Sequence, residues 1–497
     1  MQAAQPRHPP EEVARRPYGN SLPRKAPPAA GLLEGVAPMP QAEPRSLTHD
    51  LRDLAPVLLV AVLAHVAVLV IMPSGYGHPD AEQYDALATT LSRHGEYSVA
   101  PGKEMPELLR TPGYPVLVAG FYEVFGETPL PVYILQSLAA LGLAWLTYRI
   151  ALRVECPAPR LAALFTALNG NLVFYSKDLI TETLSILLLL LSLWWLYYRP
   201  NYWKVLASGL IFGIGTMMRP SFLAMVPLVC VLLVIYIWSS PWRRLAVAGL
   251  WMVLALAGPA AWVVRNYAIL ERPTITTLTG IQALTYEARV AADIHHARQD
   301  GKLGEYLLGR IKGESLGGSD FYLTNEEYRQ VLTQVGVPEH VPEWAWDGPP
   351  DLDYGKYAKR VIDRYPADYA IGVAFGWFRG LSSVSLSAAK GRLPNVWETR
   401  PGKWGLIGYM GLYWLVSCPL ALVGLIAVLI RRRGGPLKSF AWLTLGATAL
   451  VIAAAMTQGA GRYRTTVEPL LVIYSAWLLH WLWARLSRGR TSSPSHG

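Results

Sequence analysis

Carboxylates and arginines recur in this 497-residue sequence where its apolar segments end. The first such group, Asp80, Glu82 and Tyr84, follows directly after the first long apolar run. Pro79 predicts the start of a helix that stops at Gly95, which places both carboxylates in the first turn, where they oppose the helix dipole. Tyr84 shares a helical face with Asp80, four residues earlier. N-terminal capping of a surface helix is one interpretation, and acid/base chemistry is the other.

A second acidic pair, Asp178 and Glu182, lies at the start of another apolar run. Ionisable residues at or inside a membrane span are costly and usually face a cavity or a charged partner. The spacing of four residues predicts that both carboxylates project from one helical face. Glu182 is the sharper signal, because residues 183–196 are almost purely hydrocarbon. We favour a functional role for this pair over a structural ion pair.

Five arginines lie at the same ends of the apolar segments as these carboxylates. Arginine presents a planar fork that suits phosphate oxygens, and it keeps its charge. Any one of them alone could meet bulk lipid phosphate, or extend to the membrane interface along its apolar stem. Together with the carboxylates, they predict a lipid-phosphate ligand beside an acid/base site. They are Arg110, Arg219, Arg265, Arg462 and Arg464.

The elements that must position these residues are predicted to be membrane helices. The chain is 52% hydrophobic and only 16% charged, with a mean hydropathy of +0.25, whereas soluble domains typically carry about 25% charged residues. We therefore predict an all-α polytopic membrane protein with about ten transmembrane helices. The expected spans are Leu54–Met72, Pro129–Tyr148, Leu161–Tyr175, Leu179–Tyr198, Val205–Met218, Phe222–Trp238, Leu245–Val264, Leu406–Ile430, Phe440–Met456 and Thr466–Leu486.

The basic residues predict the topology, because short cytoplasmic loops are rich in Lys and Arg. The net charge is +10, from 45 Lys and Arg against 35 Asp and Glu. If the N-terminus is inside, every inner turn is basic and both termini are cytoplasmic. The inner residues are then Arg149, Arg153, Arg160, Arg199, Lys204, Arg243, Arg244, Arg431, Arg432, Arg433, Lys438, Arg485, Arg488 and Arg490.

This topology divides the chain into segments and puts the candidate site on the outer face. The first outer loop, 73–128, is expected to carry amphipathic helices, and 265–405 to form a soluble outer domain. Residues 369–389 are predicted to be an interfacial helix, since an eleventh span would place Arg431 to Arg433 outside. The full division is a disordered tail at 1–50, a catalytic transmembrane module at 51–264, the outer domain at 265–405, C-terminal transmembrane helices at 406–486 and a tail at 487–497.

Other kinds of chemistry have little support in the sequence. The three cysteines are far apart and show no Cys-x-x-Cys spacing, so neither a disulfide framework nor a cysteine metal site is expected. A divalent metal is not indicated, and we expect no cofactor. The positive charge lies in short clusters beside apolar runs, which fits membrane topology rather than nucleic-acid binding.

Six short motifs, in their order and on one membrane face, resemble the GT-C glycosyltransferases. The resemblance is greatest to the bacterial group related to protein mannosyltransferases and lipid A aminoarabinose transferases, and it extends over about residues 54–486. The motifs are Asp80–Tyr84, Arg110–Pro115, Asp178–Glu182, Met217–Pro220, Trp262–Tyr267 and Gly461–Pro469. The resemblance implies inverting transfer of a sugar from a polyprenyl-phosphate donor to a lipid, polysaccharide or protein acceptor, outside the cell membrane.

The resemblance also implies roles for individual carboxylates. The catalytic Asp that the family carries in its first outer loop is matched by Asp80, and a second acidic position by Asp178 or Glu182. Ala81 separates Asp80 from Glu82, whereas many relatives have an adjacent Asp-Glu pair. The role of each carboxylate therefore stays open.

The chemistry of such a transfer agrees with these residues. Asp80 would act as the general base towards an acceptor hydroxyl. The arginines Arg219, Arg265, Arg462 and Arg464 would stabilise the leaving lipid phosphate. Asp178 or Glu182 would orient the donor sugar or hold an arginine.

Two other classes of function remain as alternatives. A transporter or flippase for a lipid-linked sugar would also bind lipid phosphate, but we find no internal repeat between the two halves, and the ionisable residues gather at one face. A non-catalytic assembly subunit of the cell envelope would use its outer domain to bind a partner.

Overall fold

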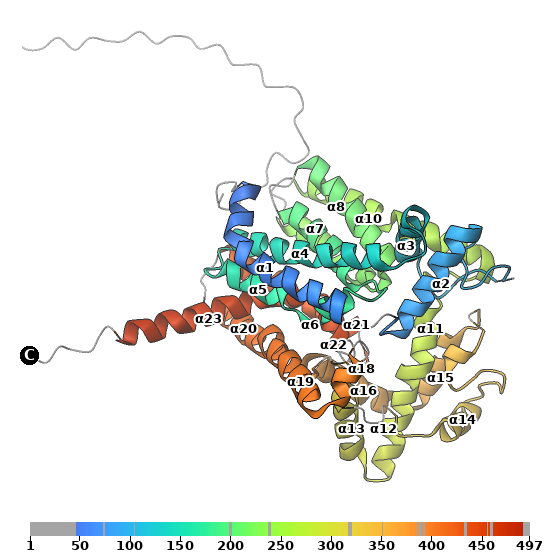
Figure 1. Cartoon of the computed structure of the whole chain (residues 1–497). Coiled ribbons are helices and arrows are strands. Elements are labelled where there is room, and N and C mark those ends of the chain that lie inside the picture. The colour runs from blue at the N-terminus through green and yellow to red at the C-terminus, as the bar shows by residue number, and fades with distance from the viewer. Residues whose placement is uncertain are drawn as a thin grey trace, which may run out of the picture.

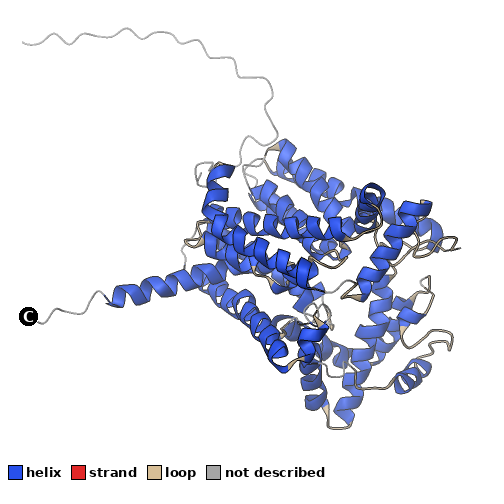
Figure 2. Cartoon of the chain, viewed as in Figure 1, coloured by secondary structure: helices blue, strands red, loops and turns tan. Residues whose placement is uncertain are grey.

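The computed structural model describes residues 46–490, except 73–74, 104, 198–200, 237–239, 317–320, 350, 385, 387–389, 391–392, 432–434, 455 and 458–460. Every regular element in these residues is a helix (Figure 2). The all-α fold class is therefore confirmed. The predicted N-terminal tail, up to residue 45, and the last seven residues lie outside the described part.

Six helices are long and apolar enough to cross a membrane. One of them is continuous through three elements, α19 (Arg400–Leu415), the π-helical η4 (Val416–Leu420) and α20 (Ala421–Arg431). The other five are α1 (Leu47–Ile71), α4 (Leu130–Arg153), α10 (Pro241–Leu270), α21 (Pro436–Ala454) and α23 (Glu468–Arg490). A multi-pass membrane protein is thereby supported.

Shorter apolar helices occupy the remaining predicted spans. They are α7 (Glu182–Tyr197), α8 (Tyr202–Met218), and the pair formed by the 3-10 helix η1 (Pro220–Met225) and α9 (Val226–Tyr236). α8 packs between α7 and α10. This short helix is therefore flanked by two apolar helices. The expected count of ten crossings stays a prediction.

The expectation of one continuous helix at 161–175 is wrong, because the helix breaks at Asn169. The segment forms two short helices, α5 (Pro159–Ala167) and α6 (Gly170–Tyr175). The Asn169 side chain accepts hydrogen bonds from the backbone N–H of Asn171 and Leu172, at 3.0 and 3.3 Å, and so caps α6. Its amide also donates to Glu468 at 2.8 Å. An asparagine that starts a new helix explains the break.

The two predicted outer segments are helical and lie together at one end of the molecule, while α23 projects from the other end (Figure 1). Backbone contacts join them, such as the Thr277 N–H to the Leu108 carbonyl at 3.0 Å. The first segment contains α2 (Pro79–His94) and α3 (Gly113–Phe125). The second contains α11 (Leu278–Gln282), the π-helical η2 (Ala283–Ala288), α12 (Arg289–Gln299), α13 (Leu303–Leu316), α14 (Asn325–Gln334), η3 (Ala345–Asp347), α15 (Tyr354–Arg364), α16 (Pro366–Ser382) and α18 (Pro394–Glu398).

The second segment has an apolar core of its own. Ile281, Leu284, Tyr328, Leu332 and Val361 pack together with almost no exposed surface. α16 spans most of the predicted interfacial helix and is not among the six long apolar helices. A short helix, α22 (Gly461–Arg464), packs against α16 and leads into α23. The outer helices therefore contact the segment that carries two of the predicted site arginines.

Candidate active site

Asp80 lies in the first turn of α2, as the sequence predicts. The helix begins at Pro79, and the His78 ring nitrogen Nδ1 caps it by accepting a hydrogen bond from the Asp80 N–H at 3.1 Å. The helix ends at Gly95, whose φ of +68° is the left-handed conformation that favours glycine. Both signals agree with the expected bounds of α2. They place Asp80 in the first turn of α2.

Arg110 binds this carboxylate instead of reaching to the membrane interface. Its Nη2 lies 2.7 Å from Asp80 Oδ1, and the guanidinium also donates to the Gln83 amide oxygen at 2.6 and 3.0 Å. It lies over the Tyr84 ring, 5.1 Å from the centroid. The Arg110 side chain is only 7% exposed, which rules out simple contact with bulk lipid. Three residues of α2 therefore hold one arginine of the first outer loop.

The position of Arg110 depends on a close approach of two backbones. Gly113, at the start of α3, faces the backbone of Met217 and Met218 at the end of α8. A Cβ atom on Gly113 would lie 2.7 Å from the Met217 carbonyl, closer than atoms in contact can come. This contact sets the first outer loop beside the turn that carries Arg219.

Arg462 joins the two predicted acidic groups, although 382 residues separate it from Asp80. Its Nη2 lies 3.1 Å from Asp80 Oδ2, and its Nε donates to Glu182 Oε1. Its Nη1 lies 2.8 Å from His78 Nε2. Arg219 binds the same Glu182 oxygen at 2.9 Å. Charges therefore alternate along one chain of contacts, from Arg110 through Asp80, Arg462 and Glu182 to Arg219.

The electrostatics of this cluster keep Asp80 ionised. Burial alone would raise the pKa of Asp80, but the guanidinium groups of Arg110 and Arg462 hold that pKa below its ordinary value. Burial and the charge of Arg462 lower the pKa of His78. With three guanidinium groups and two carboxylates, the cluster has an excess of one positive charge when His78 is neutral. Such a site favours an additional anion.

The other predicted acidic residues lie elsewhere. The expectation that Asp178 and Glu182 share a helical face is wrong, because α7 begins at Glu182 and Asp178 lies in the preceding turn. Asp178 Oδ2 accepts a hydrogen bond from the Gly77 N–H at 3.1 Å, and Gln136 binds the Asp178 carbonyl at 2.8 Å. Asp178 thus holds the segment that leads into α2. Glu82 is exposed on the far side of the first turn.

Arg265 binds the first outer loop rather than the carboxylates. Its Nη1 donates to the Glu107 carbonyl at 2.8 Å and to the Asn266 side chain at 2.7 Å. Its guanidinium stacks over the Trp262 ring at 4.5 Å. The Glu107 side chain in turn accepts from the Arg110 N–H at 3.0 Å. Arg265 therefore supports the loop that carries Arg110.

Arg464, two residues beyond Arg462, points to a different part of the protein. Its side chain is 1% exposed and pairs with Glu468 at 2.9 Å. It also donates to the carbonyls of Gly380, Leu381 and Ser383, at 2.7 to 3.2 Å. These contacts hold the C-terminal end of α16 against the start of α23. The structure therefore does not bring Arg464 to the cluster with Asp80.

Arg464→Ala is expected to act on stability, because breaking a buried ion pair costs about 3–5 kcal/mol. Thermal unfolding of the purified protein in detergent should show a clear loss of stability. Arg93→Ala is the matched control, since Arg93 pairs with Glu127 at an exposed position and should have little effect. Wild-type stability in Arg464→Ala, with loss of phosphate binding, would contradict this assignment.

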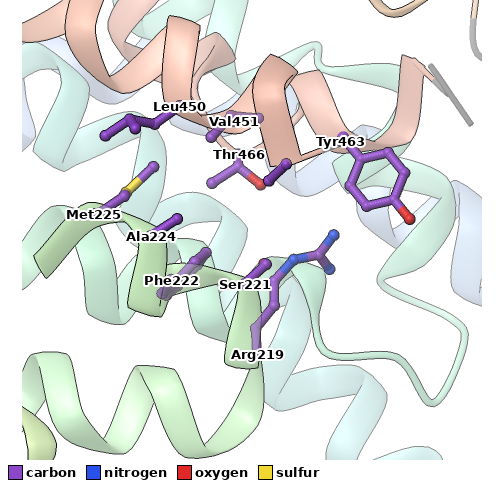
Figure 3. A pocket seen from close by; sticks show the side chains of 10 residues that line it. Arg219, Ser221, Phe222, Ala224, Met225, Leu450, Val451, Tyr463 and Thr466 are labelled. Atoms are coloured by element: carbon purple, nitrogen blue, oxygen red, sulfur yellow. The ribbon is translucent and has the colours of Figure 1, made fainter. Parts of the chain in front are cut away.

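A narrow pocket opens beside Arg219. Figure 3 shows Arg219 and Tyr463 at one end of it, with the side chains of Ser221 and Thr466 and several apolar side chains along the rest. The apolar lining includes Phe222, Met225 and Leu450. The free space in this pocket is only about 10 Å³, about the size of one water molecule, so it has no room for a lipid chain.

His78 and Gln83 also contact the cluster, although neither was predicted as a site residue. The position of each residue in the sequence could have indicated this contact. His78 directly precedes the proline that starts α2, which is the N-cap position, and Gln83 lies one helical turn after Asp80. Among the described residues, no group of three or more His, Cys, Asp and Glu side chains could hold a metal ion. The expectation of no cofactor stays a prediction.

Comparison with known proteins finds a family match over one segment of the chain. Residues 109–265 match the family model of the dolichyl-phosphate-mannose-protein mannosyltransferases (PMT). The predicted resemblance to the protein mannosyltransferases is therefore confirmed over this segment. The PMT-like segment contains Arg110, Asp178, Glu182, Arg219 and Arg265, whereas Asp80 and Arg462 lie on either side of it.

Two solved structures are similar to this chain over most of its length. The crystal structure of ArnT from Cupriavidus metallidurans bound to undecaprenyl phosphate shares 16% identity, over 86% of this chain and 78% of that one, with a TM-score of 0.37. The apo structure of the same protein shares 14% identity, over 86% and 77%, with a TM-score of 0.35. No significant match is found among curated proteins.

Proposed function

We propose that the protein transfers a sugar from a polyprenyl-phosphate donor to an acceptor at the outer face of the cell membrane. The observation that carries the proposal is the alternating cluster of Asp80 and Glu182 with three arginines. Two of these arginines, Arg110 and Arg462, bind the same Asp80 carboxylate. A phosphate needs such cations, and an acceptor hydroxyl needs such a base.

The proposed reaction is a single displacement that inverts the anomeric carbon. The acceptor oxygen forms a bond to C1 of the sugar, while the bond from C1 to the phosphate oxygen breaks and its electrons leave with the phosphate. Asp80 takes the proton of the acceptor hydroxyl. The arginines stabilise the charge on the leaving phosphate, so the proposal includes no cofactor.

Binding of the donor would also activate the base. Both Asp80 oxygens are occupied by guanidinium groups in the structure, which makes the carboxylate a weak base. The donor phosphate competes for the same guanidinium groups, and its arrival would free one oxygen of Asp80 for the acceptor proton. With less cationic contact, the pKa of Asp80 would return towards its ordinary range.

The cluster is well placed for a lipid-linked donor. The site lies where the apolar helices meet the predicted outer segments. The matched family is named for transfer of mannose from dolichyl phosphate, a polyprenyl-phosphate donor. We include in the proposal that both termini are cytoplasmic and that residues 265–405 form the outer domain.

Comparison of cell-envelope glycans, by mass spectrometry, from cells with and without the gene tests this function. We expect one glycan, lipid or glycoprotein to lose the mass of one sugar, which identifies sugar and acceptor together. An unchanged envelope would contradict the proposal. Transport of the lipid-linked sugar across vesicles without use of an acceptor would instead indicate a flippase.

A further inference from the structure

We propose that Glu287 and Arg310 are positioning residues for Arg462. They hold the backbone of Thr457, five residues before Arg462, from two sides. The inference rests on the proposed function in one respect, because it takes Arg462 to bind the donor phosphate. The clamp formed by Glu287, Arg310 and Thr457 is otherwise independent of the Asp80 cluster.

The clamp binds both backbone polar groups of one residue, the N–H and the carbonyl of Thr457. Glu287, on η2, accepts from the Thr457 N–H at 3.1 and 3.3 Å through its two carboxylate oxygens. Arg310, on α13, donates through Nη2 to the Thr457 carbonyl at 2.9 Å. Arg310 is itself held by the Tyr306 hydroxyl at 3.0 Å. Thr457 is fully buried, so η2 and α13 of the outer segment meet on a residue outside it.

A third outer helix, α16, packs directly on the same backbone. A Cβ atom on Gly376 would lie 2.0 Å from the Met456 carbonyl oxygen and 2.8 Å from the Thr457 Cα. Only glycine permits this approach. The close contact and the two hydrogen bonds together leave the Thr457 backbone little freedom to move.

Arg462 therefore lies between two fixed points. The first is Thr457, five residues before it, and the second is Arg464, which binds carbonyls at the end of α16. The guanidinium between them reaches both Asp80 and Glu182. Positioning of charged donors within about 0.5 Å is what such sites require. The outer helices thus determine where Arg462 points.

Glu287 is a costly group to bury for a purely structural contact. Burial raises its pKa to about 7, although the Thr457 hydrogen bond and the charge of Arg310 act in the opposite direction. The other titratable groups that face it are Tyr369 on α16 and Tyr463 on α22. A glutamine would keep the acceptor oxygen without the charge, and so should preserve the clamp.

Hydrogen exchange measured by mass spectrometry tests the clamp without any assay of transfer. We would use full-length protein in lipid nanodiscs and follow the peptide that contains Thr457 and Arg462. Glu287→Ala should speed exchange there by at least about tenfold, while Glu287→Gln stays near wild type. The matched control is Asp368→Asn, a buried carboxylate of α16 that pairs with His295 and Arg298. Unchanged exchange in Glu287→Ala would overturn the clamp.

Binding of undecaprenyl phosphate, compared with undecaprenol, tests whether the clamp acts through Arg462. Glu287→Ala should weaken phosphate-dependent binding by about tenfold in the wild-type protein, but by less than about twofold in Arg462→Lys, since residues that act through one another are not additive. Equal losses of binding in both backgrounds would show that the clamp affects only the general stability of the protein and does not act through Arg462. If Arg462→Lys alone leaves binding unchanged, the proposed role of Arg462 fails, while the exchange result still decides the clamp.

Discussion

Asp80→Asn is expected to lower the rate of sugar transfer by about 10²–10⁴-fold, the usual contribution of a general base. Asparagine has nearly the same shape, but it cannot take the acceptor proton at neutral pH. The fold should tolerate the change, because Arg110 keeps its bonds to Gln83 and Arg462 keeps its pair with Glu182. The measurement is the amount of product glycan in cells that express the variant at wild-type level.

Glu82→Gln is the matched control for this substitution. It removes a carboxylate from the same helical turn, but Glu82 is exposed and lies outside the cluster of Asp80, Arg110 and Arg462. We expect transfer within about twofold of wild type. A large loss in Glu82→Gln together with normal transfer in Asp80→Asn would move the role of base from Asp80 to Glu82.

Arg462→Ala is expected to have the second large effect, through both binding and stability. Removal of one preorganised group that stabilises charge costs about 10²–10³-fold in rate. It also leaves Asp80 and Glu182 without the cation between them, and breaking a buried pair costs about 3–5 kcal/mol. Transfer and thermal unfolding of the purified variant measure the two effects separately.

Two further variants separate the causes of the effect of Arg462→Ala. Arg462→Lys separates charge from geometry, and Arg298→Ala is a control outside the cluster. Lysine keeps the charge but cannot bind Asp80 and Glu182 together with a planar fork, so transfer should stay reduced while stability recovers in part. Arg298 also pairs with a buried carboxylate, Asp368, but outside the cluster, and its loss should leave transfer unchanged. Wild-type transfer in Arg462→Lys would show that geometry at this position is unimportant.

Helix ends and apolar helices could be predicted from the sequence, because each depends on neighbouring residues. Pro79 and Gly95 mark the two ends of α2, and the apolar runs mark most of the helices correctly. Acidic and basic residues at the ends of these runs also indicated the cluster, because a membrane span places an ionisable side chain only where it has a partner. Asp80, Arg110, Glu182 and Arg219 follow from that rule.

The remaining details depend on contacts between distant residues. Arg462 and Arg464 are two positions apart and identical in type, yet one meets Asp80 and the other meets Glu468, because α22 is a single turn that directs them differently. The break at Asn169 is supported by Glu468, about 300 residues later. No local pattern specifies such partners, and the same is true of the clamp on Thr457.

The most direct test of the central claim is to quantify both the product glycan and the sugar-charged polyprenyl phosphate in cells with wild-type protein or Asp80→Asn. The claim is that the cluster of Asp80, Glu182 and three arginines performs transfer from the lipid phosphate. We predict that the variant inserts into the membrane at wild-type level, that the glycan is lost and that the charged lipid accumulates. Wild-type amounts of glycan in the variant, with no accumulation of the charged lipid, would contradict the claim.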